Sequence, residues 1–268
     1  MTAPTVQILN CGSMCPRPAA LLGQAGGVLG KAQLPINCLL CETSDGWVLV
    51  DTGFGLQDCA QPAGLGRAFV GVVGPVLDVQ ETAIRQIEAL GLQASDIRHI
   101  VLTHLDLDHA GGLPDFPRAQ VHVLAHEHEL AMRRSLRDRT RYRPQHWAHG
   151  PDWSLHAVGG ERWFGFEAVQ ALRGNPDILL VPLAGHSLGH AGVAVRHATG
   201  WTLLAGDAYF YREEVYGPVR RAPLGLEVFQ AFMDRDRGLR LYNQTRLRKL
   251  VNAHSSEVHV IASHVPVP

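Results

Sequence analysis

The chain carries almost no net charge, with 24 lysine and arginine residues against 25 acidic residues and a formal net charge of -1. A protein that binds nucleic acid usually has a basic excess, so no such partner is expected. No apolar run reaches the ~20 residues that a membrane helix needs. The N-terminus also lacks the charged and apolar segments of a secretory signal. We therefore expect a soluble, cytoplasmic protein with no membrane partner.

Cysteine is also infrequent, and its pattern does not look like a disulfide framework. There are five cysteines, Cys11, Cys15, Cys38, Cys41 and Cys59, an odd number crowded toward the N-terminus. Cys38 and Cys41 have a zinc-like spacing, but no second pair follows. They fall in an apolar stretch, 36–41, that is typical of a strand, on which residues three apart face opposite sides. We expect both to be small buried hydrophobic residues, and reduced thiols fit the cytoplasm.

Apolar residues are plentiful, at 46% of the 268 residues, and histidine is unusually frequent, at 15 residues. This length suits one domain, 1–268, with a substantial core. Periodicity and turn signals predict strands at 6–9, 36–42, 47–50, 97–103, 121–124, 178–182, 193–196, 201–205 and 258–262. Helices are predicted at 78–90, 126–137 and 226–253, the first capped by Asp78 with Glu81 completing a capping box. Short strands mixed with helices predict an α/β fold in which two sheets pack face to face under helices.

One short segment carries most of the chemistry. His104-x-Asp106-x-Asp108-His109 places four metal-competent side chains directly after an apolar strand. Buried Asp and His side chains are costly unless they are paired, so a shared ligand explains this density better than packing does. A solvated polar loop is the alternative.

Three later residues extend the pattern. His186, Asp207 and His264 each follow a predicted strand. Each alone would be ordinary surface polarity. Together with the first segment they supply seven nitrogen and oxygen ligands, which is enough for two divalent cations.

These residues resemble the motifs of the metallo-β-lactamase superfamily from about Pro35 to the C-terminus. The matching pieces are Val48–Gly53, Thr103–Gly112, Gly185–His190, Gly206-Asp207 and Ser263-His264. The resemblance implies a four-layer αββα sandwich, with two mixed β-sheets flanked by helices and the site at one edge of the sheets.

The resemblance also implies a role for each residue. The first metal would be held by His104, Asp106 and His186. The second metal would be held by Asp108, His109 and His264. Asp207 would bridge the two, Asp51 would orient ligands and His190 would help to shape the site.

The metal itself is less closely defined by the residues. Most hydrolytic members of this family carry histidine where the chain has Asp106, whereas flavodiiron-type relatives carry a carboxylate. A carboxylate is a harder donor that tolerates iron or manganese better. We expect two divalent ions, with zinc as the first choice and iron or manganese as alternatives.

Two such metals, about 3.5–4 Å apart, generate a bridging hydroxide that attacks a carbonyl or phosphoryl group. Asp108 would hold the water and later move its proton. The chain is most similar to the lactonase branch, which includes N-acyl-homoserine lactonases, so a small-molecule lactone or ester-like substrate is expected. In that branch a tyrosine after the bridging Asp contacts the substrate oxygen. Phe210 stands there in this chain, so Tyr209 or Tyr211 is the candidate, with packing as the alternative.

Residues 138–165 lie where the family inserts substrate-covering loops. We predict that this segment covers the substrate, with its aromatic residues Trp147, Trp153, Trp163 and Phe164 walling an apolar pocket. The alternatives are a clamp over the sheet edge or a homodimer contact. Arg139, Arg141 and Arg143 are expected to be solvated.

Three other functions stay open. The same site could cleave a phosphodiester or β-lactam bond, although the net charge gives no sign of an RNA-binding surface. A mononuclear-iron oxidoreductase, similar to a persulfide dioxygenase, is compatible with Asp106. A non-catalytic sensor is the third, but such a protein would more often have lost ligands.

Overall fold

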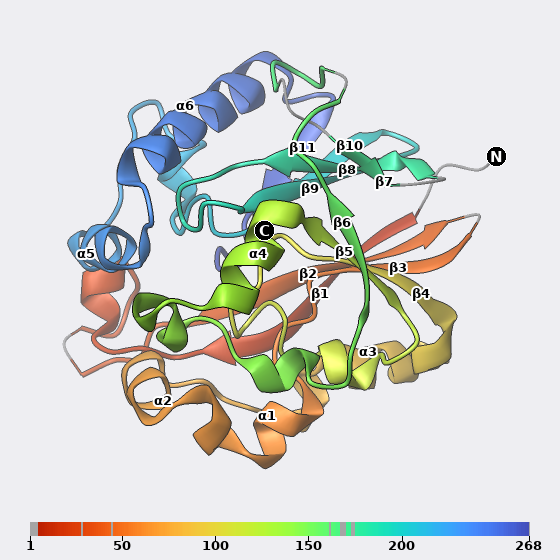
Figure 1. The fold of residues 1–268 in the computed structure, drawn as a ribbon. Helices are drawn as coiled ribbons and strands as arrows, with labels where there is room; N and C mark the ends of the chain where they lie inside the picture. The colour runs from red at the N-terminus through yellow and green to blue at the C-terminus, as the bar shows by residue number, and fades with distance from the viewer. Residues whose placement is uncertain are drawn as a thin grey trace.

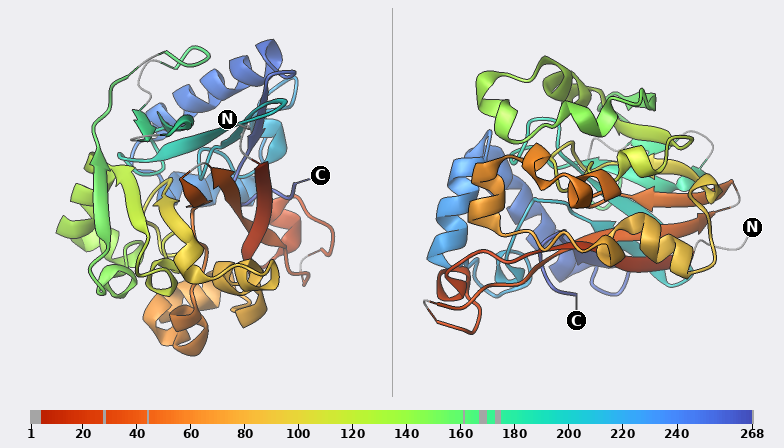
Figure 2. Two further views of the ribbon diagram at one scale, coloured as in Figure 1. Left: turned by 90° about the vertical axis from the view of Figure 1, so that its right-hand side faces the viewer. Right: turned by 90° about the horizontal axis from the view of Figure 1, so that it is seen from below.

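The protein is described from a computed structural model, which places residues 5–27, 29–43, 45–160, 162–166, 170–172 and 175–267. The ends of the predicted domain, 1–268, and Glu161 within the segment 138–165 lie outside these ranges. Two mixed sheets stack face to face, and helices cover both outer faces (Figure 1). This is the four-layer αββα sandwich that the family resemblance implies, and the left-hand view of Figure 2 shows the same stacking from the side.

The first sheet comes from the N-terminal half of the chain. Its strands are, in spatial order, β1 (Thr5–Met14), β2 (Leu34–Thr43), β3 (Gly46–Val50), β4 (Ile97–Val101), β5 (Gln120–Leu124) and β6 (Asp152–His156). β1, β2 and β3 pair antiparallel, and the pairs from β3 to β6 are parallel. The carboxyl ends of β3, β4 and β5 therefore meet at one edge.

The second sheet comes from the C-terminal half. Its spatial order is β11 (Val258–Ile261), β10 (Gly200–Leu204), β9 (Ala191–His197), β8 (Asn175–Pro182) and β7 (Gln170–Leu172). Only the β10–β11 pair is parallel. β8, β10 and β11 all end at the edge that faces the loop after β4.

The helices form the outer layers. They are α1 (Leu56–Ala60), α2 (Arg67–Val73), α3 (Ala83–Ala89), α4 (Ala125–Arg133), α5 (Leu224–Met233) and α6 (Arg237–Ala253). In Figure 1, α1, α2 and α3 lie beneath the first sheet and α6 lies above the second. Within the described ranges, none of these helices has the length and apolar character needed to span a bilayer.

Alternation along the strands explains the stacking. Leu39, Val50 and Val101 point from the first sheet into the space between the sheets, where they meet Ile178 and Val193 of the second. The opposite faces of the strands pack against the helices in two further clusters. Both sheets are thus buried on two faces, which is why their strands are apolar runs rather than alternating ones. Cys38 and Cys41 are buried and free, as predicted.

The helix predicted at 78–90 is interrupted. Asp78 caps only a single 3-10 turn, Val79–Glu81, by accepting from the Gln80 N–H at 2.9 Å. Thr82 is then extended, and its hydroxyl donates to the carbonyl of Val79 at 2.7 Å. Glu81 does not form the capping box, because its carboxylate accepts from the Ser13 hydroxyl on β1 instead.

The helical region predicted at 226–253 is two helices, broken between Met233 and Arg237. The break exposes backbone N–H groups that a continuous helix would use internally. Arg235 donates its N–H to the carbonyls of Gly185 and His186, and Asp236 donates to Gly185 at 2.9 Å. The interruption therefore anchors the loop that carries His186.

The cap of α6 provides a stability test. The Asp236 side chain accepts from the Leu239 N–H at 2.9 Å at the start of this 17-residue helix. We expect Asp236→Ala to lower the free energy of unfolding by about 1 kcal/mol, measured by urea denaturation followed by circular dichroism. Asp78→Ala, which uncaps only one 3-10 turn, is the matched control and should cost less. An equal loss in both variants would contradict this assignment.

Candidate metal centre

Seven side chains that the sequence singled out converge at one edge of the sandwich. The loop after β4 brings His104, Asp106, Asp108 and His109, and the loops after β8, β10 and β11 bring His186, Asp207 and His264. All seven residues are buried. The convergence follows from the topology, because these four strands end at facing edges of the two sheets.

A first group of ligand atoms surrounds one point. Asp106 Oδ2 lies 3.5 Å from His104 Nε2 and 3.0 Å from His186 Nε2. Asp207 Oδ2 lies 3.8 and 3.3 Å from the same two nitrogens. Two imidazoles and two carboxylate oxygens therefore face one another.

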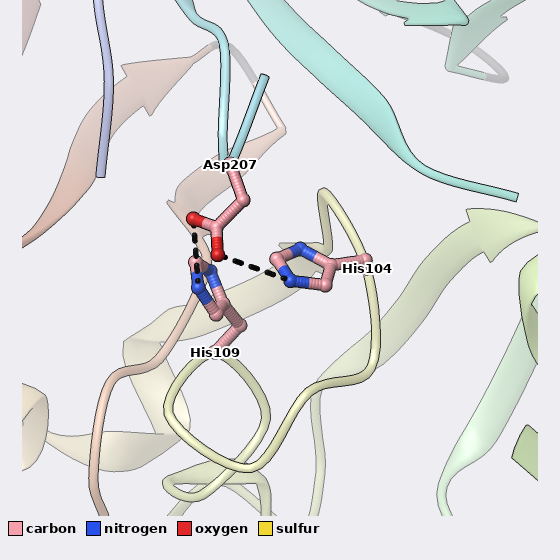
Figure 3. A group of neighbouring side chains, drawn as sticks. All are labelled: His104, His109 and Asp207. Carbon is pink, nitrogen blue, oxygen red and sulfur yellow. Dashed lines mark ion pairs between the residues drawn. The ribbon is translucent and has the colours of Figure 1, made fainter. Parts of the chain in front are cut away.

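A second group has the same composition. Asp108 Oδ2 lies 3.9 Å from His109 Nε2 and 3.4 Å from His264 Nε2. Asp207 Oδ1 lies 3.3 and 3.2 Å from these nitrogens. Figure 3 shows how Asp207 joins the groups, with one carboxylate oxygen directed at His104 and the other at His109.

The spacing fits divalent cations. Zinc binds imidazole nitrogen and carboxylate oxygen at about 2.0–2.2 Å, so tetrahedral neighbours lie roughly 3.3–3.6 Å apart. The contacts within both groups bracket that value. His104 Nε2, His109 Nε2 and Asp207 Oδ1 are also buried without any hydrogen-bond partner. Such atoms are costly to leave unsatisfied, and a cation in each group would satisfy all three.

Asp51 and Thr103 orient the first loop. The Asp51 carboxylate accepts from the Thr103 N–H and hydroxyl, both at 2.8 Å, and from His109 Nδ1 at 2.9 Å. Nδ1 of His109 therefore donates to Asp51, which leaves Nε2, the atom that faces Asp207, as the one that can bind a cation. This agrees with the orienting role expected for Asp51.

The loop that carries His264 is tied to the other sheet. His264 Nδ1 donates to the Pro35 carbonyl at 2.9 Å. Asn37 of β2 donates its side-chain amide to the carbonyls of Ala262 and Val265, at 2.9 and 2.8 Å. The first sheet thus fixes a ligand that belongs to the second.

His190 supports Asp207 from behind. Its Nδ1 donates to the Leu183 carbonyl and its Nε2 accepts from the Asp207 backbone N–H, both at 3.0 Å. These bonds require a neutral ring, and burial lowers the pKa of His190 to about 3. His190 therefore positions Asp207, in agreement with its expected role in shaping the site.

Burial and close charged neighbours shift the pKa values of the ligand residues in both directions. Burial raises the pKa of Asp108, whereas His264 and His109 overcome burial and hold the pKa of Asp207 well below its ordinary value. Burial and the neighbouring His109 lower the pKa of His104 well below its ordinary value. The carboxylates of Asp207 and Asp108 outweigh burial and raise the pKa values of His109 and His264. Metal is bound by carboxylates and neutral imidazoles, so a cation would replace protons that Asp108, His109 and His264 otherwise retain.

Asp106 has a partner that the sequence prediction missed. Arg141, expected to be solvated, is buried and places its guanidinium against the Asp106 carboxylate at 2.6 Å. The prediction was wrong because it treated the arginines of this segment as one solvated group. Asp106 itself is the available signal, because an extra carboxylate in a buried cluster calls for a compensating cation.

Glu127 and Tyr142 are further missed residues. Glu127, on α4, accepts from the Leu105 N–H at 3.1 Å, the Ser187 hydroxyl at 2.5 Å and the Tyr142 hydroxyl at 3.0 Å. This one buried carboxylate thereby links the loop after β4, the loop after β8 and the segment 138–165. A lone glutamate in an amphipathic helix gives no sequence signal for such a role.

The aromatic residues after Asp207 are placed differently from the expectation. Tyr209 is buried, and its hydroxyl donates to the Val260 carbonyl at 3.4 Å within the core of the second sheet. Its expected contact with substrate is not supported by this placement, while the role of Tyr211 stays a prediction. Phe210 is the residue at the cluster. Its ring stacks on that of His264 with the centroids 5.3 Å apart, and its centroid lies 6.0 Å from that of the His186 ring.

The segment 138–165 contains more structure than expected. It includes β6, which completes the first sheet. Trp147 and Trp153 pack against the helix-covered core of that sheet, and Trp163 is buried in the core of the second. These three indoles pack rather than wall a pocket, so this placement favours the clamp, and substrate covering by other parts of the segment stays a prediction.

Comparison with known proteins agrees with the geometry. The sequence model of the Metallo-beta-lactamase superfamily matches residues 32–252. A probable metallo-hydrolase of Mycobacterium tuberculosis is 42% identical over 267 residues, which cover 98% of this chain and 81% of that protein. The N-acyl homoserine lactonase AttM of Rhizobium johnstonii is 27% identical over 219 residues, covering 76% of this chain and 75% of its own length.

Solved structures share the fold. An N-acyl homoserine lactone hydrolase with N-hexanoyl-L-homoserine bound at its catalytic metal center superposes with a TM-score of 0.72 at 22% identity, covering 97% of this chain and 93% of that one. AidC, a dizinc quorum-quenching lactonase, gives a TM-score of 0.64 at 16% identity, covering 100% and 89%.

Removal of the Asp51 carboxylate tests the orientation of His109. In Asp51→Asn the amide nitrogen would replace one of the two accepting oxygens. Its N–H₂ group would then face another donor, either the Thr103 N–H or the Thr103 hydroxyl and His109 Nδ1. We expect zinc affinity at the second group to fall about 10–100-fold, measured by titration against a competing chelator. Asp45→Asn, in an exposed turn, should leave zinc affinity unchanged. Wild-type affinity in Asp51→Asn would show that Asp51 does not orient a ligand.

Proposed function

Because the chain belongs to the metallo-beta-lactamase superfamily, we propose that it is a metal-dependent hydrolase that opens a lactone or similar ester-like bond of a small molecule. The proposal rests on the way the two carboxylate oxygens of Asp207 face two groups of ligand side chains that have the same composition. Each group supplies two imidazoles and one carboxylate of its own. This arrangement suits a site for two divalent cations that share one anionic ligand.

Two bound cations would lower the pKa of a water molecule to near neutral. They would also polarise the oxygen of a carbonyl group. Zinc suits ligand sets of imidazole and carboxylate, with iron or manganese as alternatives. His104, Asp106 and His186 would hold the first cation, and Asp108, His109 and His264 the second.

Asp108 is the residue best placed to move a proton. Its side chain is 12% exposed, against 5% for Asp106 and Asp207 and at most 1% for the histidines. We expect water and substrate to reach the site at Asp108, the most exposed of the seven ligand side chains. A carboxylate there can accept a proton from the attacking water and pass it to the leaving oxygen.

Phe210 gives the site an apolar wall. It lies flat against His264 and pairs with Phe229 of α5 at a centroid distance of 5.4 Å. This wall offers no hydroxyl to a substrate oxygen, so recognition there rests on apolar contact. The support for a lactone is the likeness to lactonases such as AttM, together with this apolar surface.

Metal removal tests the first part of the proposal. Dialysis against a strong chelator should reduce lactone hydrolysis to the uncatalysed rate, because the polarising and water-activating groups are lost. Addition of zinc should restore it, with the rate followed by the acid released on ring opening. Hydrolysis that persists in metal-free protein would overturn the proposal.

Replacement of Asp108 tests the role of the protein itself. We expect Asp108→Ala to lower kcat/KM for an acyl homoserine lactone by about 10²-fold or more, since proton transfer and a ligand are both lost. The circular dichroism spectrum should stay unchanged, and Asp45→Ala should retain full activity. A panel of lactone, β-lactam and phosphodiester substrates, assayed side by side, decides the bond. Turnover confined to the last two would refute the lactone assignment.

A further inference from the structure

Arg141 makes an unusually complete set of contacts at the first group of ligands. Its Nε donates to Asp106 Oδ1 at 2.8 Å and its Nη2 to Asp106 Oδ2 at 2.6 Å. Its Nη1 donates to the carbonyls of His186 and Met233, both at 2.9 Å. All three guanidinium nitrogens therefore donate hydrogen bonds, and only 2% of the residue is exposed.

These contacts control what Asp106 can offer to a cation. Oδ1 accepts from Nε of Arg141. Oδ2 accepts from Nη2 and also lies 3.0 Å from His186 Nε2. Because the two parallel hydrogen bonds fix the plane of the carboxylate, a cation in this group meets one oxygen rather than two.

Arg141 also changes the charge of the group. Both groups contain two imidazoles, one carboxylate that belongs to that group alone (Asp106 or Asp108) and one oxygen of Asp207. Arg141 offsets the charge of Asp106, whereas Asp108 has no arginine partner among the residues that the structure describes. The two groups are thus alike in shape but differ by about one unit of charge.

We propose that Arg141 is a positioning and specificity-determining residue that turns Asp106 into a one-oxygen, charge-compensated ligand of the first cation. The two residues function only as a pair. The inference rests on the proposed metal centre and deepens it. Without Arg141 the carboxylate would carry its full charge and could offer both oxygens, which suits manganese better than zinc.

If the two residues act as a pair, Arg141→Gln should change zinc affinity in opposite directions in the wild type and in the Asp106→His variant. Arg141→Gln removes the charge but keeps an amide donor for the backbone carbonyls. In the wild-type background we expect it to weaken zinc binding at the first group about 10–100-fold. In the Asp106→His background Arg141 is an unpaired cation beside the metal, so the same substitution should strengthen zinc binding. A residue that only braces the loops would weaken binding in both backgrounds.

The experiment measures metal binding and not turnover. Zinc stoichiometry is determined by mass spectrometry and zinc affinity by chelator competition for the wild type, R141Q, D106H and D106H/R141Q. Manganese competition is measured alongside, and R141Q should shift the preference toward manganese. Arg139→Met, an exposed neighbour in the same segment, is the matched control and should behave as wild type.

The outcomes separate this inference from the proposed function. Failure of the wild type to bind two cations would remove the metal centre itself. Two cations in the wild type, with weaker zinc binding in both backgrounds, would overturn only the role of the pair. If R141Q does not fold by circular dichroism, R141M supplies the neutral variant in both backgrounds, and the same reversal is required.

Discussion

The carboxylate of Asp207 is the group on which the site depends. Among the residues that the structure describes, it is the carboxylate that contacts the imidazoles of both groups, with Oδ2 facing His104 and His186 and Oδ1 facing His109 and His264. Four histidines and three carboxylates can share a small buried volume only if their charges and lone pairs are satisfied. Two cations on the two oxygens of Asp207 would satisfy them, and the surrounding hydrogen bonds would then hold each ring in the orientation that binding needs.

The sequence was sufficient for the cluster and for the fold because both leave local signals. Asp and His directly after an apolar strand are conspicuous in four places, and parallel strands bring such positions together at one edge. The apolar runs at 36–42, 121–124 and 178–182 mark strands that are buried on both faces, and each lies within an observed strand. These signals need no knowledge of distant contacts.

The supporting residues could not be predicted in the same way. Arg141 looks like its exposed neighbour Arg139, and only the approach of Asp106, 35 positions earlier, distinguishes the two. Glu127 occupies an ordinary helical position, and its three donors come from separate loops. The break between α5 and α6 is likewise set by the carbonyls of Gly185 and His186, which compete for N–H groups that helical periodicity assigns to one long helix. Tertiary partners decide each of these cases.

Asn37 gives the architecture a further consequence. Its amide holds the strand end that presents His264, so the first sheet contributes to a ligand that the second sheet supplies. Neither half of the chain can assemble the cluster alone. Any ion held there would stabilise the association of the two halves, because separating them would also release the ion. Affinity for that ion would therefore add to the stability of the docked sheets, independently of any chemistry carried out at their edge.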